Sequence, residues 1–340
     1  MQRLMFDMQK IAGLLGIRRG ATSTYLVVLL LALTGIFSIV LPDQFFRIAN
    51  LQSMASQVPE LGILAMAMMI TMLSGGINLA IIASTNMAGI VTAYILTHFI
   101  PADTSVTAAA LVMMGAVLAG LAISMIIGLL NGWIIAYLSV SPILTTLGTM
   151  TLIQGLNVLL TKGYVISGFP EPIIFIGNGM ILGIPMPILI FIACALFMSL
   201  LLRKTTFGLS VYMMGSNEQA TLFSGIRVKR VTLKIYVLSG FYCGIAALIM
   251  ISRFNSAKAG YASSYLLVTI LAAVLGGVDP FGGFGKMMGL VLALLILQVI
   301  SSGLNLLGMS AHLTMALWGG ILIFILFLNQ LRDRLGHAKS

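Results

Sequence analysis

The chain has 340 residues, of which 60% are hydrophobic and only 8% charged, and its mean hydropathy is +1.12. Ordinary soluble domains carry charge on about a quarter of their residues, so this composition excludes that class. It predicts an integral membrane protein. The net charge of +10 therefore indicates cations spread unevenly across a membrane, and not a nucleic-acid partner.

Stretches without Asp, Glu, Lys or Arg predict the number of membrane spans. They are residues 20–42, 61–102, 104–161, 172–202, 235–252, 259–278 and 287–331. A spanning helix takes about 20 apolar residues, so these stretches hold about ten spans. A membrane β-barrel would alternate apolar and polar residues, whereas 290–297 is apolar on every side. The predicted fold class is all-α, a polytopic membrane bundle of about ten transmembrane helices.

The expected spans, in chain order, are 24–41, 61–77, 80–98, 107–128, 141–160, 185–202, 235–252, 262–278, 286–303 and 311–328. Residues 1–19 alternate basic residues with apolar residues at helical spacing, which predicts a short helix in the membrane interface. The first apolar run is full length and lacks a small-residue cleavage site, so it is expected to remain as a span. The whole chain, 1–340, is expected to form one membrane domain.

The basic residues predict the orientation of the spans. Four lie before the first span, six between Arg203 and Lys234, and three after the last span, and with Lys286 these fourteen fall on one side. The other side keeps four: Arg47, Lys162, Arg253 and Lys258. By the positive-inside rule, both termini and the segment 203–234 are cytoplasmic. One alternative stays open, because a third short helix within 104–161 would place that segment outside; two helices are favoured.

The inventory of reactive residues predicts no enzyme, no cofactor and no metal site. His98, His312 and His337 are scattered, and neither HExxH nor CxxC occurs. The nearest approach to a phosphate loop is Gly285–Lys286, but Met287 stands where magnesium binding needs Ser or Thr. Cys194 and Cys243 fall inside expected spans and are interpreted as small apolar residues and not as a disulfide.

Charged residues are not expected in the middle of any span. Glu60, Asp103 and Asp279 fall at expected span ends, where a solvated position is the simpler interpretation. Ion-driven pumps usually hold a charge inside their helices, so proton coupling is disfavoured and sodium coupling is weakened.

Amides and hydroxyls inside the apolar stretches are the candidates for a translocation path. They are Asn78, Asn86, Thr145, Gln154, Asn157 and Asn305, together with Asn131, Thr146 and Gln298. Lipid offers such groups no hydrogen-bond partner, so each must find one inside the protein or in a polar solute. They suit a neutral polyhydroxylated solute. The alternative for any one of them is a hydrogen bond that holds two helices together.

The segment 203–234 contains a predicted short helix. Ser216 to Gln219 fit a capping box, with Ser216 as the N-cap and Glu218 near the positive helix end. The helix is expected from Asn217 to about Ser224, between Gly215 and Gly225. Such a capped helix is either a docking element for a protein partner or only a solvated connector.

Several motifs, taken in order, resemble the ribose-type permeases of bacterial ABC sugar importers. They are Met72–Leu79 (MLSGGINL), Ser141–Thr149 (SPILTTLGT), Gly208 with Gly215–Ala220 and Ser224–Ile226, Ala272–Gly277, Gly282–Gly285, and Gly303–Gly308. Two departures remove carboxylates: Asn78 stands where the family often has Asp, and 264–267 reads SYLL where many members have Glu-Leu-Asp.

The resemblance implies an ABC permease fold in the bacterial inner membrane, with a separate ATPase subunit, a periplasmic solute-binding protein and a second permease copy, identical or related. It also implies that 203–234 is the coupling loop, contacting the ATPase through Gly215, Ser216, Asn217, Glu218, Ala220 and Gly225. The expected solute is a monosaccharide or a similar small polar molecule. Nucleoside or branched-chain amino-acid permeases, and an ion-coupled secondary transporter, are the alternatives.

Overall fold

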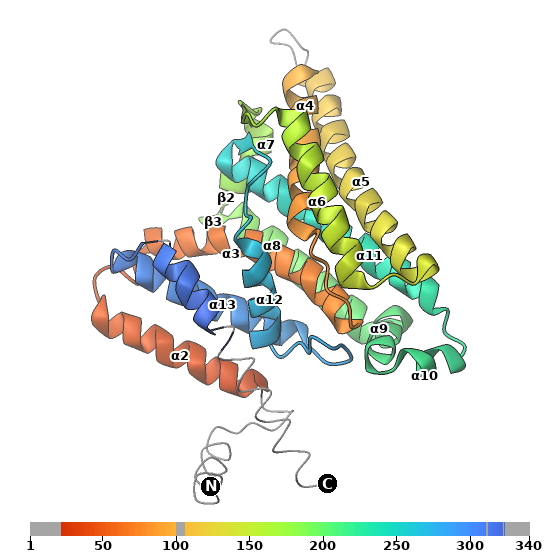
Figure 1. Ribbon diagram of the computed structural model, residues 1–340. Coiled ribbons are helices and arrows are strands. Elements are labelled where there is room, and N and C mark those ends of the chain that lie inside the picture. Colours follow the sequence, from red (N-terminus) through yellow and green to blue (C-terminus); the bar gives the residue numbers. More distant parts are fainter. Residues whose placement is uncertain (1–21, 100–105, 311, 322, 324–340) are drawn as a thin grey trace, which may run out of the picture.

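The computed structural model describes residues 22–99, 106–310, 312–321 and 323. The interfacial helix expected at 1–19 lies outside this range, as do parts of the last expected span at 311–328. The described chain is a helical bundle with two short two-stranded sheets, so the predicted all-α membrane fold is confirmed (Figure 1).

The helices are α2 (Thr22–Val40), α3 (Ile48–Leu73), α4 (Ile81–His98), α5 (Val106–Leu138), α6 (Pro142–Thr161), α7 (Glu171–Asn178), α8 (Met186–Lys204), α9 (Thr206–Ser216), α10 (Glu218–Phe223), α11 (Val228–Phe254), α12 (Tyr265–Leu275) and α13 (Met287–Leu306). The strands are β1 (Ile166–Ser167), β2 (Met180–Ile181), β3 (Ile184–Pro185) and β4 (Ser256–Ala257). β1 pairs antiparallel with β4, with Ile166 opposite Ala257, and β2 pairs antiparallel with β3, with Met180 opposite Pro185.

Eight helices of the described chain are long and apolar enough to cross a membrane. The span expected at 262–278 is wrong in extent, because α12 has only 11 residues and is too short to cross the bilayer. Within the stretch 104–161, the described residues 106–161 form two helices and no third, as favoured from the charge pattern. The first of them, α5, has 33 residues and is therefore about 50 Å long, well beyond the hydrocarbon thickness.

Three spanning helices form the centre of the bundle. α3, α4 and α11 are mostly buried within the protein, whereas α2, α5, α6 and α8 leave most of their surface uncovered. α11 packs along α5, α3 and α4, and α13 packs against α2 and α3. Inner helices can carry polar groups because neighbouring helices supply partners, and outer helices must be apolar toward lipid.

The two ends of the bundle differ in construction. α8 leads into α9 and α10 at one end, where the chain then enters α11 (Figure 1). The loop between α12 and α13 belongs to this end too, because the Gly283 amide donates to the Leu73 carbonyl at the end of α3 (2.9 Å). We call this end of the bundle, which holds α9, α10 and the loop between α12 and α13, the coupling end, after the role expected of the segment 203–234. The opposite end holds α7 and both small sheets, and there the Asn178 amide donates to the Ser252 carbonyl of α11 (3.0 Å).

The described cations divide between these ends as the sequence predicted. Seven lie at or next to the coupling end: Arg203, Lys204, Arg227, Lys229, Arg230, Lys234 and Lys286. Four lie at the opposite end: Arg47, Lys162, Arg253 and Lys258. The side of the membrane that each end faces stays a prediction.

The chain between α3 and α4 turns back into the bundle. Gly75 has φ +82°, a left-handed conformation that glycine adopts without strain, and it reverses the chain after α3. The Asn78 amide then donates to the Ser239 hydroxyl, 3.0 Å away, on the buried face of α11. Ser239 in turn donates to the Ala67 carbonyl within α3 (2.8 Å). The segment before α4 is therefore held beside Ala67, about two turns before the end of α3.

Candidate functional site

The segment 203–234, expected as a loop, is built of helix ends and two short helices. α8 continues to Lys204, α9 follows after Thr205, and α11 already begins at Val228. The Thr205 hydroxyl accepts a hydrogen bond from the Gly208 amide (3.2 Å), which caps the start of α9. Short connections leave little freedom, so this end presents a rigid surface.

The cap of α10 is Asn217, and the prediction of Ser216 is wrong by one residue. The Asn217 side-chain oxygen accepts from the Ala220 amide (2.9 Å), and the Asn217 backbone is extended, with φ −161° and ψ 107°. Ser216 is the last residue of α9, so its backbone is helical and cannot take the extended conformation of an N-cap. Asn217 ends one helix and begins the next.

The rest of the predicted helix is confirmed. α10 runs from Glu218 to Phe223, with Glu218 in its first turn, where the helix dipole favours a carboxylate. Gly225 follows with φ +79° and donates to the Leu222 carbonyl (3.0 Å), which ends the helix. Thr221 is buried beneath it, whereas Phe223 is 88% exposed. A large aromatic side chain therefore projects from the coupling end.

Gly215 has a packing role that its sequence position did not reveal. A methyl group at this position would collide with the Leu73 carbonyl oxygen of α3 and with the Gly283 amide. Gly282 is equally constrained, because a side chain there would meet the Gly75 amide and the Gly215 backbone. Three segments of backbone thus touch without intervening side chains. α9, the end of α3 and the loop 276–286 form one unit.

Tyr212 fastens the same unit from α9. Its hydroxyl donates to the Gly285 carbonyl (2.8 Å). Burial raises the pKa of Tyr212 above its ordinary value, and the nearby Arg203 opposes this only in part. The phenol therefore keeps the proton that it donates.

The predicted path residues are not gathered around one cavity. Asn78 is buried, donates to Ser239 and accepts from the Ala80 amide (3.1 Å), so both ends of its amide have partners inside the bundle. Asn78 thus fits the alternative given for such amides, a hydrogen bond that holds two parts of the bundle together. Asn131, on α5, likewise accepts from the Thr149 hydroxyl of α6 (2.6 Å).

α6 lies against α4 and against the chain between α3 and α4, which it contacts through hydroxyl and amide groups. The Thr146 hydroxyl donates to the Ile77 carbonyl (3.0 Å) and accepts from the Leu79 amide (3.1 Å). The Asn157 amide donates to the Ala83 carbonyl (3.0 Å), while its buried oxygen and the buried Thr145 hydroxyl have no protein partner. Such orphaned atoms can accept or donate a bond to water or a solute.

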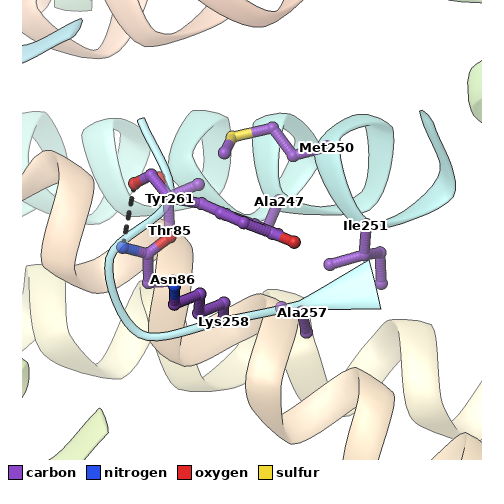
Figure 2. A pocket seen from close by; sticks show the side chains of 9 residues that line it. Thr85, Asn86, Ala247, Met250, Ile251, Ala257, Lys258 and Tyr261 are labelled. Carbon is purple, nitrogen blue, oxygen red and sulfur yellow. Dashed lines mark hydrogen bonds between the residues drawn. The ribbon is translucent and has the colours of Figure 1, made fainter. Parts of the chain in front are cut away.

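Asn86 lines a small pocket between α4, α11 and the segment that follows α11. Its amide donates to the Ala259 carbonyl (3.0 Å) and the Tyr261 carbonyl (3.1 Å), as Figure 2 shows for Tyr261. The cavity itself is only about 10 Å³, about the room that one water molecule needs. Ligand sites usually exceed about 300 Å³, so this pocket is too small for a monosaccharide as it stands.

Gln154 and Asn305 are both exposed. Asn305 lies at the end of α13, which packs mainly against α2, α3 and α12. Gln154 lies on the outer face of α6 with Gly148, Thr151 and Gly155. The path roles of all six predicted residues stay predictions.

Comparison with known proteins places the chain in a family. Residues 50–326 match the family model described as the branched-chain amino acid transport system / permease component. The ribose import permease protein RbsC of Bacillus subtilis is 32% identical over 338 residues, 97% of this chain and 96% of that protein. The chain belongs to this permease family. Its ribose-type resemblance is thereby confirmed.

Other relatives of the permease are import system subunits as well. The autoinducer 2 import system permease protein LsrD of Salmonella typhi is 32% identical over 271 residues, 78% of each chain. The same protein of Escherichia coli O9:H4 is 31% identical over 271 residues, 78% of this chain and 79% of its own. No solved structure matches.

A buried ion pair was missed in the sequence. Glu60 was expected at a solvated span end, but α3 of the permease starts at Ile48 and buries the Glu60 side chain completely. Arg253, at the end of α11, lies 3.1 Å from it. The signal was present: Leu51, Met54 and Val58 continue the helical apolar spacing upstream of Glu60.

Within the described part of the permease, no three His, Cys, Asp or Glu residues come together to hold a metal ion. Cys194 and Cys243 are both buried and unpaired, in agreement with their interpretation as apolar residues.

Proposed function

We propose that this permease is the membrane subunit of an ATP-driven importer that moves a monosaccharide or a similar small polar solute across a bacterial inner membrane. The observation that carries the proposal is the end-to-end match with a ribose import permease. The chain has no phosphate loop of its own, so ATP hydrolysis belongs to a separate subunit.

The proposed contact with the ATPase is the surface of α9 and α10. The coupling residues Gly215, Ser216, Asn217, Glu218, Ala220 and Gly225 all lie in or beside these helices. Their rigid connection to the end of α3 supports transmission of movement into the membrane, because packed backbones shift together. The periplasmic binding protein would dock at the opposite end, on α7 and the small sheets.

The outer face of α6 is proposed to meet a second permease copy, with the path between the two. Gly148 and Gly155 have open space around them, and Gln154 is exposed on the same spanning helix. An amide facing lipid is costly, whereas a second copy or a passing solute can bond it. Membrane lipid would cover the remaining apolar faces of α2, α5 and α8.

Transport by reconstituted complexes tests this function. The permease would be placed in liposomes alone, with an ATPase, and with the ATPase and a binding protein, and uptake of radiolabelled ribose would be followed. We expect uptake only in the complete complex with ATP. Uptake by the permease alone would instead show a secondary transporter.

The family description favours one second candidate, branched-chain amino acids. Radiolabelled leucine and a nucleoside, presented with their own binding proteins, would separate these substrates from ribose. ATP-dependent uptake of leucine and not of ribose would replace the sugar proposal while keeping the ATP-driven permease.

The orientation needs a separate test. In a Cys194→Ala, Cys243→Ala background, one cysteine at Gly225 should react with an impermeant thiol reagent only after the cells are opened. A cysteine at Leu182, which is 97% exposed at the opposite end, is the matched control and should react in intact cells. The reverse pattern would show that the two ends of the bundle face the opposite sides of the membrane from those predicted.

A further inference from the structure

The loop between α12 and α13 carries an exposed aromatic residue that the coupling residues do not include. Phe281 is 88% exposed, the same exposed fraction as Phe223 on α10. It follows Asp279 and Pro280 in a non-helical segment that starts at Gly276 and ends at Lys286. The charged residues Asp279 and Lys286 place this segment at the membrane surface and not within the hydrocarbon layer.

Hydrogen bonds close the loop on itself, so the backbone of Phe281 has a fixed position. The Asp279 carboxylate accepts from the Phe281 amide (2.9 Å), and the Asp279 carbonyl accepts from the Gly282 amide (3.1 Å). The Asp279 amide donates to the Phe284 carbonyl (2.9 Å), which ties the two sides of the turn. The backbone that carries the ring is therefore already ordered, so only the few side-chain rotamers of Phe281 lose entropy when a partner covers it.

The loop is also fixed to the end of α3 and to α9. Gly283 donates to Leu73, Gly282 lies against Gly215, and Tyr212 of α9 donates to Gly285. Because α3 is among the most buried spanning helices, a loop lying on its end is over the interior of this surface and not at its lipid-facing rim. The neighbours of Phe281 are thus the elements that lead into α10.

We propose that Phe281 and its loop form a second contact for the ATPase, continuous with α9 and α10. This rests on the proposed function, since it extends the same coupling surface. The contact would have two lobes on one rigid support, one centred on Phe223 and one on Phe281. Aromatic side chains at the centre of an interface commonly contribute most of its affinity.

Photocrosslinking in membranes that contain the complete importer tests the proposal. Benzoylphenylalanine would replace Phe281, Phe223 or Leu182, one at a time, and a tagged ATPase would be sought in the products. We expect ATPase adducts from positions 281 and 223 and none from 182. Adducts from 223 alone would overturn this proposal and leave the proposed function intact.

Other outcomes are equally decisive. Adducts from 281 only to lipid or to a second permease copy would show that something else covers this loop, which overturns the proposal. No ATPase adduct from either position would remove both the second contact and the proposed coupling surface.

Substitution gives a second readout. Phe281→Ala should lower ATPase copurification at least several-fold while the permease elutes normally in size exclusion, because the exposed ring supports no core packing. Phe281→Tyr should keep ATPase copurification near the wild-type level, and Leu182→Ala should leave ATPase copurification unchanged, because Leu182 lies at the opposite end. Full copurification by Phe281→Ala would overturn the contact.

Discussion

Arg253 Nη1 lies 3.1 Å from Glu60 Oε2, and this ion pair joins the middle of α3 to the end of α11. The two side chains differ in exposure: Glu60 is fully buried, whereas 22% of the Arg253 side chain is exposed. Loss of either partner therefore has a different consequence for the other. An arginine without Glu60 can extend into solvent, but a carboxylate without Arg253 stays buried and uncompensated.

The ion pair predicts an asymmetric effect on stability. Arg253→Gln should destabilise the permease by about 3–5 kcal/mol, the usual cost of leaving a buried charge unpaired, and Glu60→Gln should cost distinctly less. The double variant should recover most of the loss caused by Arg253→Gln. Thermal unfolding of the purified permease in detergent measures all three, and equal losses from the two single variants would contradict the prediction.

The cap position predicts that Asn217 and Ser216 respond differently to alanine. Asn217→Ala removes the acceptor for the Ala220 amide, which should destabilise α10 by about 0.5–2 kcal/mol. Ser216→Ala removes no cap and changes no helix start. Hydrogen exchange of residues 218–223 should rise only for Asn217→Ala. Equal exchange in both variants would mean that neighbouring contacts, and not the cap, hold α10 in place.

The coupling role predicts a local charge effect at Glu218. Glu218→Lys places a cation at the positive end of α10 and inside the proposed ATPase contact, so copurifying ATPase and ATP-linked uptake should fall at least tenfold. Glu171→Lys is the matched control for ATPase copurification, because Glu171 also lies in the first turn of a short helix, at the opposite end. Both variants should insert normally. Full ATPase association of Glu218→Lys would show that α10 is only a connector.

Packing and path roles can be separated with Asn78 and Gln154. Asn78→Leu leaves the Ala80 amide without its acceptor inside the bundle, a loss of about 1–3 kcal/mol, so membrane abundance and uptake should fall together. Gln154→Leu alters only an exposed position on α6, so uptake should fall while abundance is unchanged. Quantitative blotting beside uptake assays distinguishes the two. Normal uptake by Gln154→Leu would remove it from the path.

Much of the fold was predictable because hydrophobic runs report directly on the bilayer. The runs around 24–41, 80–98, 141–160, 185–202 and 286–303 became helices with ends within a few residues of the expected ones. The capped helix 218–223 was predictable for a similar reason, since its cap, acidic first turn and terminal glycine are local in sequence. Even there the N-cap moved by one residue, because α9 extends through Ser216.

What depended on partners distant in sequence could not be predicted. Glu60 was assigned to a span end because a charge ordinarily stops an apolar run. The apolar spacing upstream could have shown that the helix continues through it, but the partner that compensates its buried charge, Arg253, lies 193 positions later. Likewise, Gly215, Gly75 and Gly282 belong to separate motifs in the sequence, and nothing in those motifs shows that the three residues meet. The tertiary structure brings their backbones into contact, where any side chain would prevent the approach. Sequence alone thus determined which segments enter the membrane, because that depends on each residue's own transfer from water, whereas charge pairing and close packing depend on which segments meet.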